Sequence, residues 1–218
     1  MASSPVSSNL SGVEDKSKMQ TIYLTDIRRF AQLIDSYTVL LRPERQKKML
    51  SYSLLDDRLR CLAGGILLEQ AAEGREICFT AKGKPFLPDG PHLSLAHSGN
   101  YVCLAVCVSG PVGIDIEEQR DVNYSDLGKT AFHQAEYDFL MQEPGAGRFY
   151  DLWTLKESYV KMIGSGFSIE PSSFCVLPDK HILPEGIPFM QNFNFIKGYS
   201  LALCAMEPIE ARITVYQG

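Results

Sequence analysis

The stretch at 151–168, which reads DLWTLKESYVKMIGSGFS, decides the fold of this chain. At about 100° per residue it predicts a helix with one apolar side. That side consists of Leu152, Leu155, Tyr159, Met162 and Ile163. The opposite side carries Trp153, Glu157, Lys161 and Gly164. The glycines at 164–166 predict the end of the helix, because glycine readily adopts the left-handed conformation that stops one.

The charged side of this helix has two interpretations. A glutamate followed by a lysine four residues later is a common surface pair, which stabilises a helix by about 0.2–0.5 kcal/mol. However, Trp153 lies beside Glu157 and Lys161, and it is the single tryptophan of the chain. We therefore expect something other than solvent to pack against this side.

A second stretch, PVGIDIEEQR at 111–120, predicts a strand with one acidic face. Alternation places Ile114 and Ile116 on one face and Asp115 and Glu117 on the other, with Gly113 leaving open space beside the carboxylates. Neighbouring carboxylates repel each other unless they are neutralised, and carboxylate oxygens suit Mg²⁺. The alternative is an edge strand whose outward charges prevent aggregation. These residues by themselves leave both interpretations open.

Together, GIDIE at 113–117 and WTLKESYVKMIGSG at 153–166 resemble the paired signature of the 4'-phosphopantetheinyl transferases of the surfactin-synthetase (Sfp) type. That family shows G-[IV]-D-[IV]-E and then W-[ST]-x-K-E-[SA]-x-x-K-x-x-G-x-G, and every fixed position is present. The resemblance spans most of 40–216. It implies an enzyme that transfers the 4'-phosphopantetheine arm of coenzyme A to a serine of an apo acyl carrier or peptidyl carrier protein. Adenosine 3',5'-bisphosphate is released, and the carriers serve fatty-acid, polyketide or nonribosomal peptide synthesis.

The resemblance also implies roles for the charged residues of both stretches. Mg²⁺ is held by Asp115, Glu117 and Glu157, and the catalytic residues are Asp115, Glu157 and Lys161. Lys161 stabilises or protonates the leaving phosphate. Glu157 is also a candidate general base for the serine, directly or through water, although metal ligation lowers the basicity of a carboxylate.

Five further residues match positions at which the family binds coenzyme A, its co-substrate. Each has an ordinary surface or structural interpretation when taken by itself. They are Arg45 and Lys48 in a basic helix at 43–50, Arg60, Lys84 in a G-K-P loop at 83–85, and His97 in LSLAHSGNY. The last block departs from the family's N-[IL]-S-H-S, because Ser94 replaces Asn and Ala96 replaces the first Ser. Glu136 resembles a family glutamate, but Ala131 replaces a Phe of that motif, and we do not assign Glu136 to the metal.

The order of elements predicts an α+β fold made of two pseudo-duplicated subdomains, each a long helix packed on a small antiparallel sheet. A helix at 57–70 followed by the strand EICFT parallels the helix at 150–163 followed by SSFCV. Three strands at 92–98, 101–108 and 112–118 predict an antiparallel meander. We expect a disordered leader at 1–18, an N-terminal subdomain at 19–120 and a C-terminal subdomain at 121–218. The active site is then expected at the interface of the subdomains.

Composition excludes several classes of protein. A net charge of −5 over 218 residues argues against a nucleic-acid binder, and no run of eighteen apolar residues predicts a membrane span. The six cysteines show neither CxxC nor zinc-site spacing, so we expect reduced thiols and a cytoplasmic location. We also expect a monomer, because a duplicated chain can build one site by itself.

Two alternative functions remain. One is another Mg²⁺-dependent enzyme that acts on nucleotides, which the absence of GxxxxGK[ST] disfavours. The other is a non-catalytic module of the same fold that binds coenzyme A or a carrier. The presence of all the acidic residues and of Lys161 disfavours that alternative.

Overall fold

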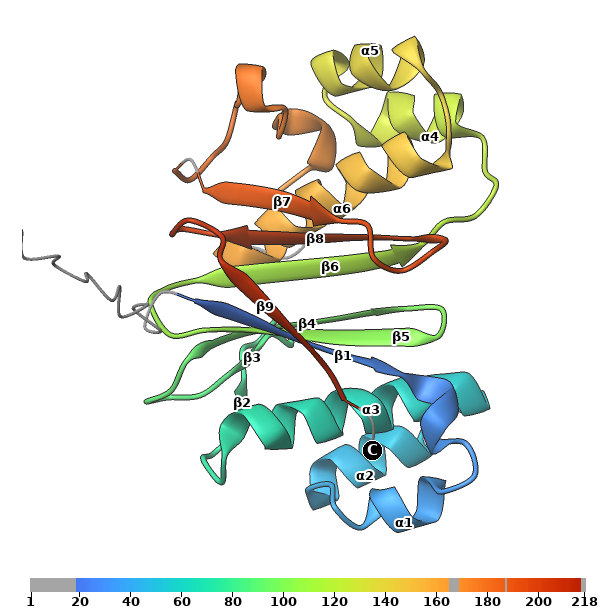
Figure 1. The fold of residues 1–218 in the computed structure, drawn as a ribbon, viewed down its shortest axis with the longest axis vertical. Helices are drawn as coiled ribbons and strands as arrows, with labels where there is room; N and C mark the ends of the chain where they lie inside the picture. Colours follow the sequence, from blue (N-terminus) through green and yellow to red (C-terminus); the bar gives the residue numbers. More distant parts are fainter. Residues whose placement is uncertain (1–18, 165–168, 187, 217–218) are drawn as a thin grey trace, which may run out of the picture.

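The computed structural model describes residues 19–164, 169–186 and 188–216. It stacks a helix, a sheet, a second sheet and a second helix, as Figure 1 shows. Helix α3 (Leu55–Ala72) covers the first sheet and helix α6 (Ala146–Ile163) covers the second. The predicted α+β class, with long helices packed on small sheets, is confirmed. The leader predicted at 1–18 lies outside the described residues.

The first sheet has the strand order β4-β5-β1-β9. Its strands are β1 (Gln20–Asp26), β4 (His92–Ser98), β5 (Tyr101–Cys107) and β9 (Ala211–Val215). Neighbours are antiparallel except β1 and β9, which run parallel. The predicted small antiparallel sheet therefore carries one parallel strand, β9, at its edge. The reason is that β9 arrives by a crossover from the second sheet, and a crossover can deliver a parallel strand where a tight hairpin cannot.

The second sheet has the order β6-β8-β7 and is antiparallel throughout. Its strands are β6 (Val112–Glu118), β7 (Phe189–Phe193) and β8 (Tyr199–Ala205). The predicted meander is correct for β4 and β5 but wrong for β6, which forms its ladder with β8. The hydroxyls of Ser94 and Ser98 on β4 bridge to β6 instead, by accepting from the backbone N–H groups of Ile114 (3.1 Å) and Glu118 (3.0 Å).

Strand pairing interlocks the two halves of the chain. Strand β6 precedes residue 120 but lies in the sheet of the C-terminal half, and β9 belongs to the sheet of the N-terminal half. A domain boundary at 120 and a duplication of the two halves stay predictions.

The remaining elements are short. They are η1 (Ile27–Phe30), α1 (Ile34–Thr38), α2 (Pro43–Leu50), β2 (Cys78–Phe79), β3 (Pro85–Phe86), α4 (Tyr124–Ala131), α5 (Gln134–Gln142), η3 (Pro171–Ser173) and η4 (Pro178–Lys180). Helices α4 and α5 are separated at Phe132 and His133. The division occurs because His133 caps α5, with its ring accepting from the N–H of Ala135 and the Glu136 carboxylate accepting from the N–H of His133.

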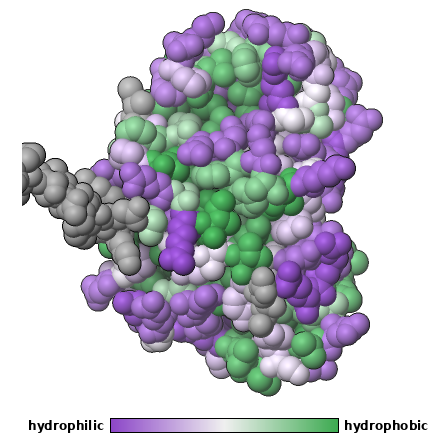
Figure 2. Space-filling model, in the orientation of Figure 1, coloured by the Kyte–Doolittle hydropathy of each residue, from purple (hydrophilic) through white to green (hydrophobic). Residues whose placement is uncertain are grey.

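The hydrophobic core lies in three layers. One layer packs α3 against the first sheet, a second lies between the sheets, and a third packs α6 against the second sheet and α4–α5. Ile114 and Ile116 belong to the middle layer, so the predicted alternation of β6 is confirmed. Figure 2 shows hydrophobic side chains along the middle of one face, where β8 and β9 cross it, with mostly hydrophilic side chains around them. None of the helices described in the structure is both long and apolar enough to cross a bilayer.

Helix α6 approaches β6 closely at Gly113. A Cβ atom built there would lie 1.9 Å from the carbonyl oxygen of Ser158 and 2.5 Å from the backbone nitrogen of Met162. The space that the sequence predicts to be open is therefore filled by the helix backbone. This approach brings the acidic face of β6 directly against α6.

Gly113→Ala should destabilise the protein strongly. Two backbones would have to separate, and overpacking a core typically costs about 1–3 kcal/mol or more. The measurement is the free energy of unfolding by urea. Gly110→Ala is the matched control, because a Cβ at Gly110 meets no atom within 4 Å. Equal stability of the two variants would contradict the packing described here.

Candidate active site

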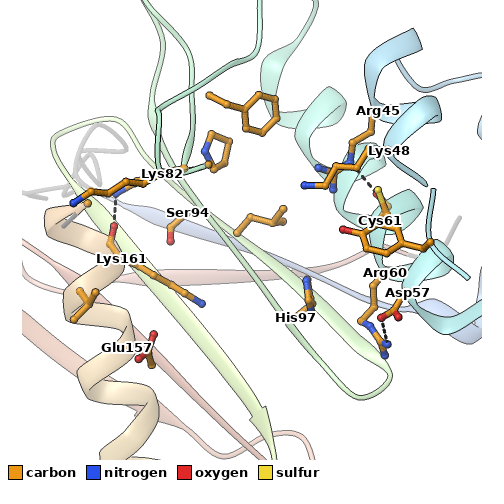
Figure 3. Close-up of a pocket in the computed structure, with 18 residues that line it drawn as sticks. Arg45, Lys48, Asp57, Arg60, Cys61, Lys82, Ser94, His97, Glu157 and Lys161 are labelled. Atoms are coloured by element: carbon orange, nitrogen blue, oxygen red, sulfur yellow. Dashed lines mark hydrogen bonds and ion pairs between the residues drawn. The ribbon is translucent and has the colours of Figure 1, made fainter. Parts of the chain in front are cut away.

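A cavity of about 380 Å³ lies between the two halves of the molecule. Figure 3 shows basic side chains of α2 and α3 on one side, Glu157 and Lys161 of α6 on the other, and Ser94 and His97 of β4 between them. Seven of the predicted site residues line this cavity. They are Arg45, Lys48, Arg60, Lys84, His97, Glu157 and Lys161. Residues far apart in the sequence are thus brought to one place.

Asp115 and Lys161 form an ion pair behind the cavity wall. The Lys161 Nζ donates to Asp115 Oδ1 at 2.6 Å, and Asp115 is 3% exposed. Among the described ion pairs, Lys161 therefore pairs across to β6 rather than with Glu157 one turn away on its own helix. Burial disfavours the charged form of Lys161 and acts to lower its pKa. The charge and hydrogen bond of Asp115 have the larger effect, so the pKa of Lys161 is raised.

Glu117 is held by the hydroxyl of Ser98. This hydroxyl donates to Glu117 Oε2 at 2.8 Å and accepts from the N–H of Glu118 at 3.0 Å. The backbone of β6 therefore fixes the hydroxyl, and the hydroxyl orients the carboxylate. Glu157 lies half-buried on α6 at the cavity wall.

The pKa values of all three carboxylates are raised. Burial is the largest cause for each, and the charge of Asp115 adds to the increase at Glu117 and at Glu157. Lys161 offsets part of the increase at all three sites. A raised pKa means that the folded protein disfavours the anionic form of each carboxylate, and a bound cation would stabilise that form.

One carboxylate oxygen lacks a partner. Asp115 Oδ2 is buried without a hydrogen bond among the described residues, whereas its Oδ1 bonds Lys161. A buried oxygen of this kind is a ligand of the type that a hard divalent cation takes. As they stand, no three His, Cys, Asp or Glu groups of the described residues are close enough together to form a finished metal site. The donor chemistry fits a cation, and Lys161 occupies part of that region.

The basic wall of the cavity is positioned by α3. Arg45 lies across this helix, where Gly64 and Gly65 make room for it, and its Nε donates to the carbonyl of Cys61 at 3.1 Å. Arg60 donates to Asp57 at 2.6 Å and to the carbonyl of Gly99 at 2.8 Å. Two glycines inside a helix are unfavourable by roughly 1 kcal/mol each, so their presence here indicates a requirement for close packing.

His97 faces the cavity at the end of β4. The His97 side chain is exposed in part, but desolvation by the surrounding protein lowers its pKa, and the charges of Arg60 and Lys161 lower it further. The imidazole is therefore mostly neutral at neutral pH, and an anion bound next to it would favour its protonation.

Known proteins match most of the chain. A family model described as the 4'-phosphopantetheinyl transferase superfamily matches residues 111–204. The chain is 32% identical over 194 residues to a 4'-phosphopantetheinyl transferase of Bacillus subtilis, covering 80% of this chain and 86% of that protein. It is 33% identical over 183 residues to the transferase gsp of Aneurinibacillus migulanus, covering 75% of each. It is 29% identical over 198 residues to the transferase Sfp of Bacillus subtilis strain 168, covering 80% and 86%.

The chain belongs to the 4'-phosphopantetheinyl transferases of the Sfp type. The resemblance seen in the sequence is thereby confirmed. The individual roles of the site residues in this transferase stay predictions.

Two features of this transferase are missed by the sequence analysis. Lys156 and Glu136 form a fully buried ion pair at 2.6 Å, and the same lysine bonds the carbonyl of Phe174 at 2.6 Å. Glu136 thus lies in the core behind α6. Ser98 is the second omission, and the available signal was its spacing of four residues from Ser94, which places both hydroxyls on one face of β4.

Trp153 also receives its explanation from the structure. It lies half-buried in the layer formed by α4, α5 and α6, with its ring 6.5 Å from that of Phe132. Protein therefore covers the first half of the charged side of α6. The cavity begins further along the helix, at Glu157.

Lys161→Met should destabilise the metal-free transferase by about 3 kcal/mol, the low end for a broken buried ion pair, because Lys161 is partly exposed. The loss should shrink between about pH 7 and pH 4. The reason is that burial raises the folded-state pKa of Asp115 above its unfolded value, so lowering the pH neutralises the unpaired carboxylate.

The measurement is urea unfolding in EDTA across this pH range. The control is Lys129→Met, which removes an exposed charge from α4. A loss of stability in Lys161→Met that does not change with pH would contradict the pairing with Asp115.

Proposed function

We propose that this transferase moves the 4'-phosphopantetheine arm of coenzyme A to a serine hydroxyl of an apo acyl carrier or peptidyl carrier protein. The observation that carries the proposal is the cavity, which has a basic wall on one side and Glu157 and Lys161 on the other. A ligand with phosphates at one end and a reacting diphosphate at the other matches this distribution of charge.

The basic wall is proposed to bind the phosphates of coenzyme A. Arg45, Lys48, Arg60 and His97 line one continuous cavity, and they come from α2, α3 and β4. Arginine and lysine both bind phosphate, and arginine can do so with two donors at once. The reacting diphosphate then lies near Lys161.

Asp115, Glu117 and Glu157 are the residues that would hold Mg²⁺. This assignment rests on the unpartnered oxygen of Asp115 and on the raised pKa values of all three carboxylates. When bound, Mg²⁺ neutralises charge on the diphosphate and polarises the phosphorus that is attacked.

The reaction forms one bond and breaks one. The carrier serine oxygen bonds to the phosphorus that bears the pantetheine arm, and the bond between this phosphorus and the bridging oxygen breaks. Adenosine 3',5'-bisphosphate leaves with the electron pair. Lys161 is placed to stabilise or protonate the oxygen that leaves, an interaction that strengthens as charge develops.

Glu157 is the proposed acceptor of the serine proton, directly or through water. Burial raises its pKa and so makes the carboxylate more basic. Ligation by a metal acts in the opposite direction. Its role as a metal ligand therefore takes precedence over its role as a base.

The cell compartment and assembly follow the same proposal. All six cysteines are free thiols, which suits a reducing cytoplasm. A single chain supplies every wall of the cavity, so we propose that the enzyme works as a monomer.

The proposal is tested by incubating the transferase with coenzyme A, Mg²⁺ and a panel of apo carrier domains from fatty-acid, polyketide and peptide synthesis. Intact-mass measurement should show a carrier that gains the phosphopantetheine arm. Coenzyme A should also raise the melting temperature of the transferase. If no carrier gains mass and coenzyme A does not bind, the proposed function is wrong.

Two variants serve as controls for the mechanism in this assay. Glu157→Gln should reduce kcat and weaken the response to Mg²⁺. Lys161→Ala should reduce kcat by about 10²–10³-fold, the effect of one lost electrostatic donor, with little change in Mg²⁺ dependence. Near-normal turnover in both variants would exclude Glu157 and Lys161 from the mechanism.

His97→Gln should weaken coenzyme A binding by about tenfold at pH 6 and less at pH 8, because it removes one charge-assisted hydrogen bond. In the wild type, affinity should rise as the pH falls through this range. The free imidazole has a lowered pKa, so binding a phosphate requires the uptake of a proton. Calorimetric titration of both proteins with coenzyme A measures the effect, and identical pH profiles would remove His97 from the binding site.

A further inference from the structure

Lys84 occupies an unusual position at the rim of the cavity. It lies in the loop that joins β2 to β3, and its Nζ donates to the carbonyls of Met162 (3.1 Å) and Val112 (3.3 Å) and also to the carbonyl of Lys161. One ammonium group thereby joins the hairpin, the first residue of β6 and the last turn of α6. Its aliphatic chain lies beside Gly164, where a Cβ would meet the Lys84 Cδ at 3.9 Å.

The last turn of a helix needs such a partner. The final four carbonyls of an α-helix receive no hydrogen bond from within the helix, and the C-terminus of the helix carries a partial negative charge. Lys161 and Met162 belong to that turn of α6, which ends at Ile163. A cation that bonds both carbonyls satisfies them and interacts favourably with the helix dipole.

The bonds to these carbonyls use the whole donor capacity of the lysine. An ammonium group has three protons, and three carbonyls accept from Lys84. Burial lowers the pKa of Lys84 to about 8, so the group is still mostly charged at neutral pH. Contact with a ligand phosphate would require the loss of a bond to the protein.

The elements that Lys84 joins are those that carry the proposed catalytic groups. The backbone of Lys161 is held by Lys84, while its side chain pairs with Asp115. Val112 begins the strand on which Asp115 lies. Lys84 therefore fixes the end of α6 against β6 at the point where Lys161 reaches across.

We propose that Lys84 is a positioning residue, which acts through α6 and β6 on Lys161 and Glu157, rather than a ligand for the phosphates of coenzyme A. This inference rests on the proposed function for its kinetic consequences. Its structural consequence, the ordering of the end of α6, holds for the free protein and is independent of activity.

The test compares Lys84→Met with Lys82→Met. Methionine keeps the length of the side chain but donates no hydrogen bond, and Lys82 lines the same cavity from the same loop. Three quantities are measured: hydrogen exchange at the last turn of α6 in the free protein, the Kd for coenzyme A by calorimetry, and kcat.

For Lys84→Met we expect faster exchange at the amides of 160–164, because the last turn loses its anchor. We expect kcat to fall by about 10- to 100-fold through misplacement of Lys161. The Kd for coenzyme A should change by less than about threefold, because in this proposal Lys84 makes no contact with bound coenzyme A. Lys82→Met should leave exchange at these amides close to that of the wild type.

The opposite pattern overturns the inference. A Kd that weakens by about tenfold or more with unchanged exchange would make Lys84 a phosphate ligand. Unchanged exchange together with unchanged kcat would leave it no positioning role. If Lys84→Met does not fold, Lys84→Arg is judged by the same criteria, because arginine keeps the charge but presents a planar fork in place of three radiating donors.

Failure of the proposed function gives a different result. In that case the wild-type protein neither binds coenzyme A nor modifies a carrier. The exchange measurement on the free protein would still decide whether Lys84 anchors α6.

Discussion

The contact between α6 and β6 at Gly113 is the constraint on which the rest of the structure depends. With no side chain at this position, the helix backbone lies directly against the strand. At this separation the Lys161 side chain crosses to Asp115 and bonds it at 2.6 Å. On the other face of β6, Ile114 packs in the hydrophobic layer between the sheets. One glycine thus couples the packing of the core to the geometry of the cavity.

The site places charged groups in buried or half-buried positions, and side chains of neighbouring elements pair with most of them. The ammonium of Lys161 compensates Asp115, and the hydroxyl of Ser98 holds Glu117. Ser94 and Ser98 also satisfy backbone groups of β6 that a neighbouring strand would otherwise bond. The edge strands β4 and β6 of the two sheets therefore meet along a polar seam, beside which the cavity opens. The Asp115 oxygen that has no hydrogen-bond partner among the described residues is where we propose that a cation binds.

The local pattern of the sequence was sufficient for the elements that carry the site. The 3.6-residue period predicts α6, and Gly164 ends it with φ of 72° as expected. The two-residue alternation correctly divides Ile114 from Asp115 on β6. The same pattern, read with the paired signature, identified the transferase family before any contact was known. These features depend on neighbours in the chain, and periodicity records them directly.

Contacts between distant parts of the chain were decided only by the tertiary structure. Lys161 pairs with a residue 46 positions away rather than with Glu157 on its own helix, and Lys84 bonds carbonyls nearly 80 positions away. Likewise β6 joins β8, and β9 returns to run parallel to β1. Local patterns show that a strand has a face to bury but not which sheet will bury it. That choice is made by packing the whole chain, and the precise partners of the charged groups follow from it.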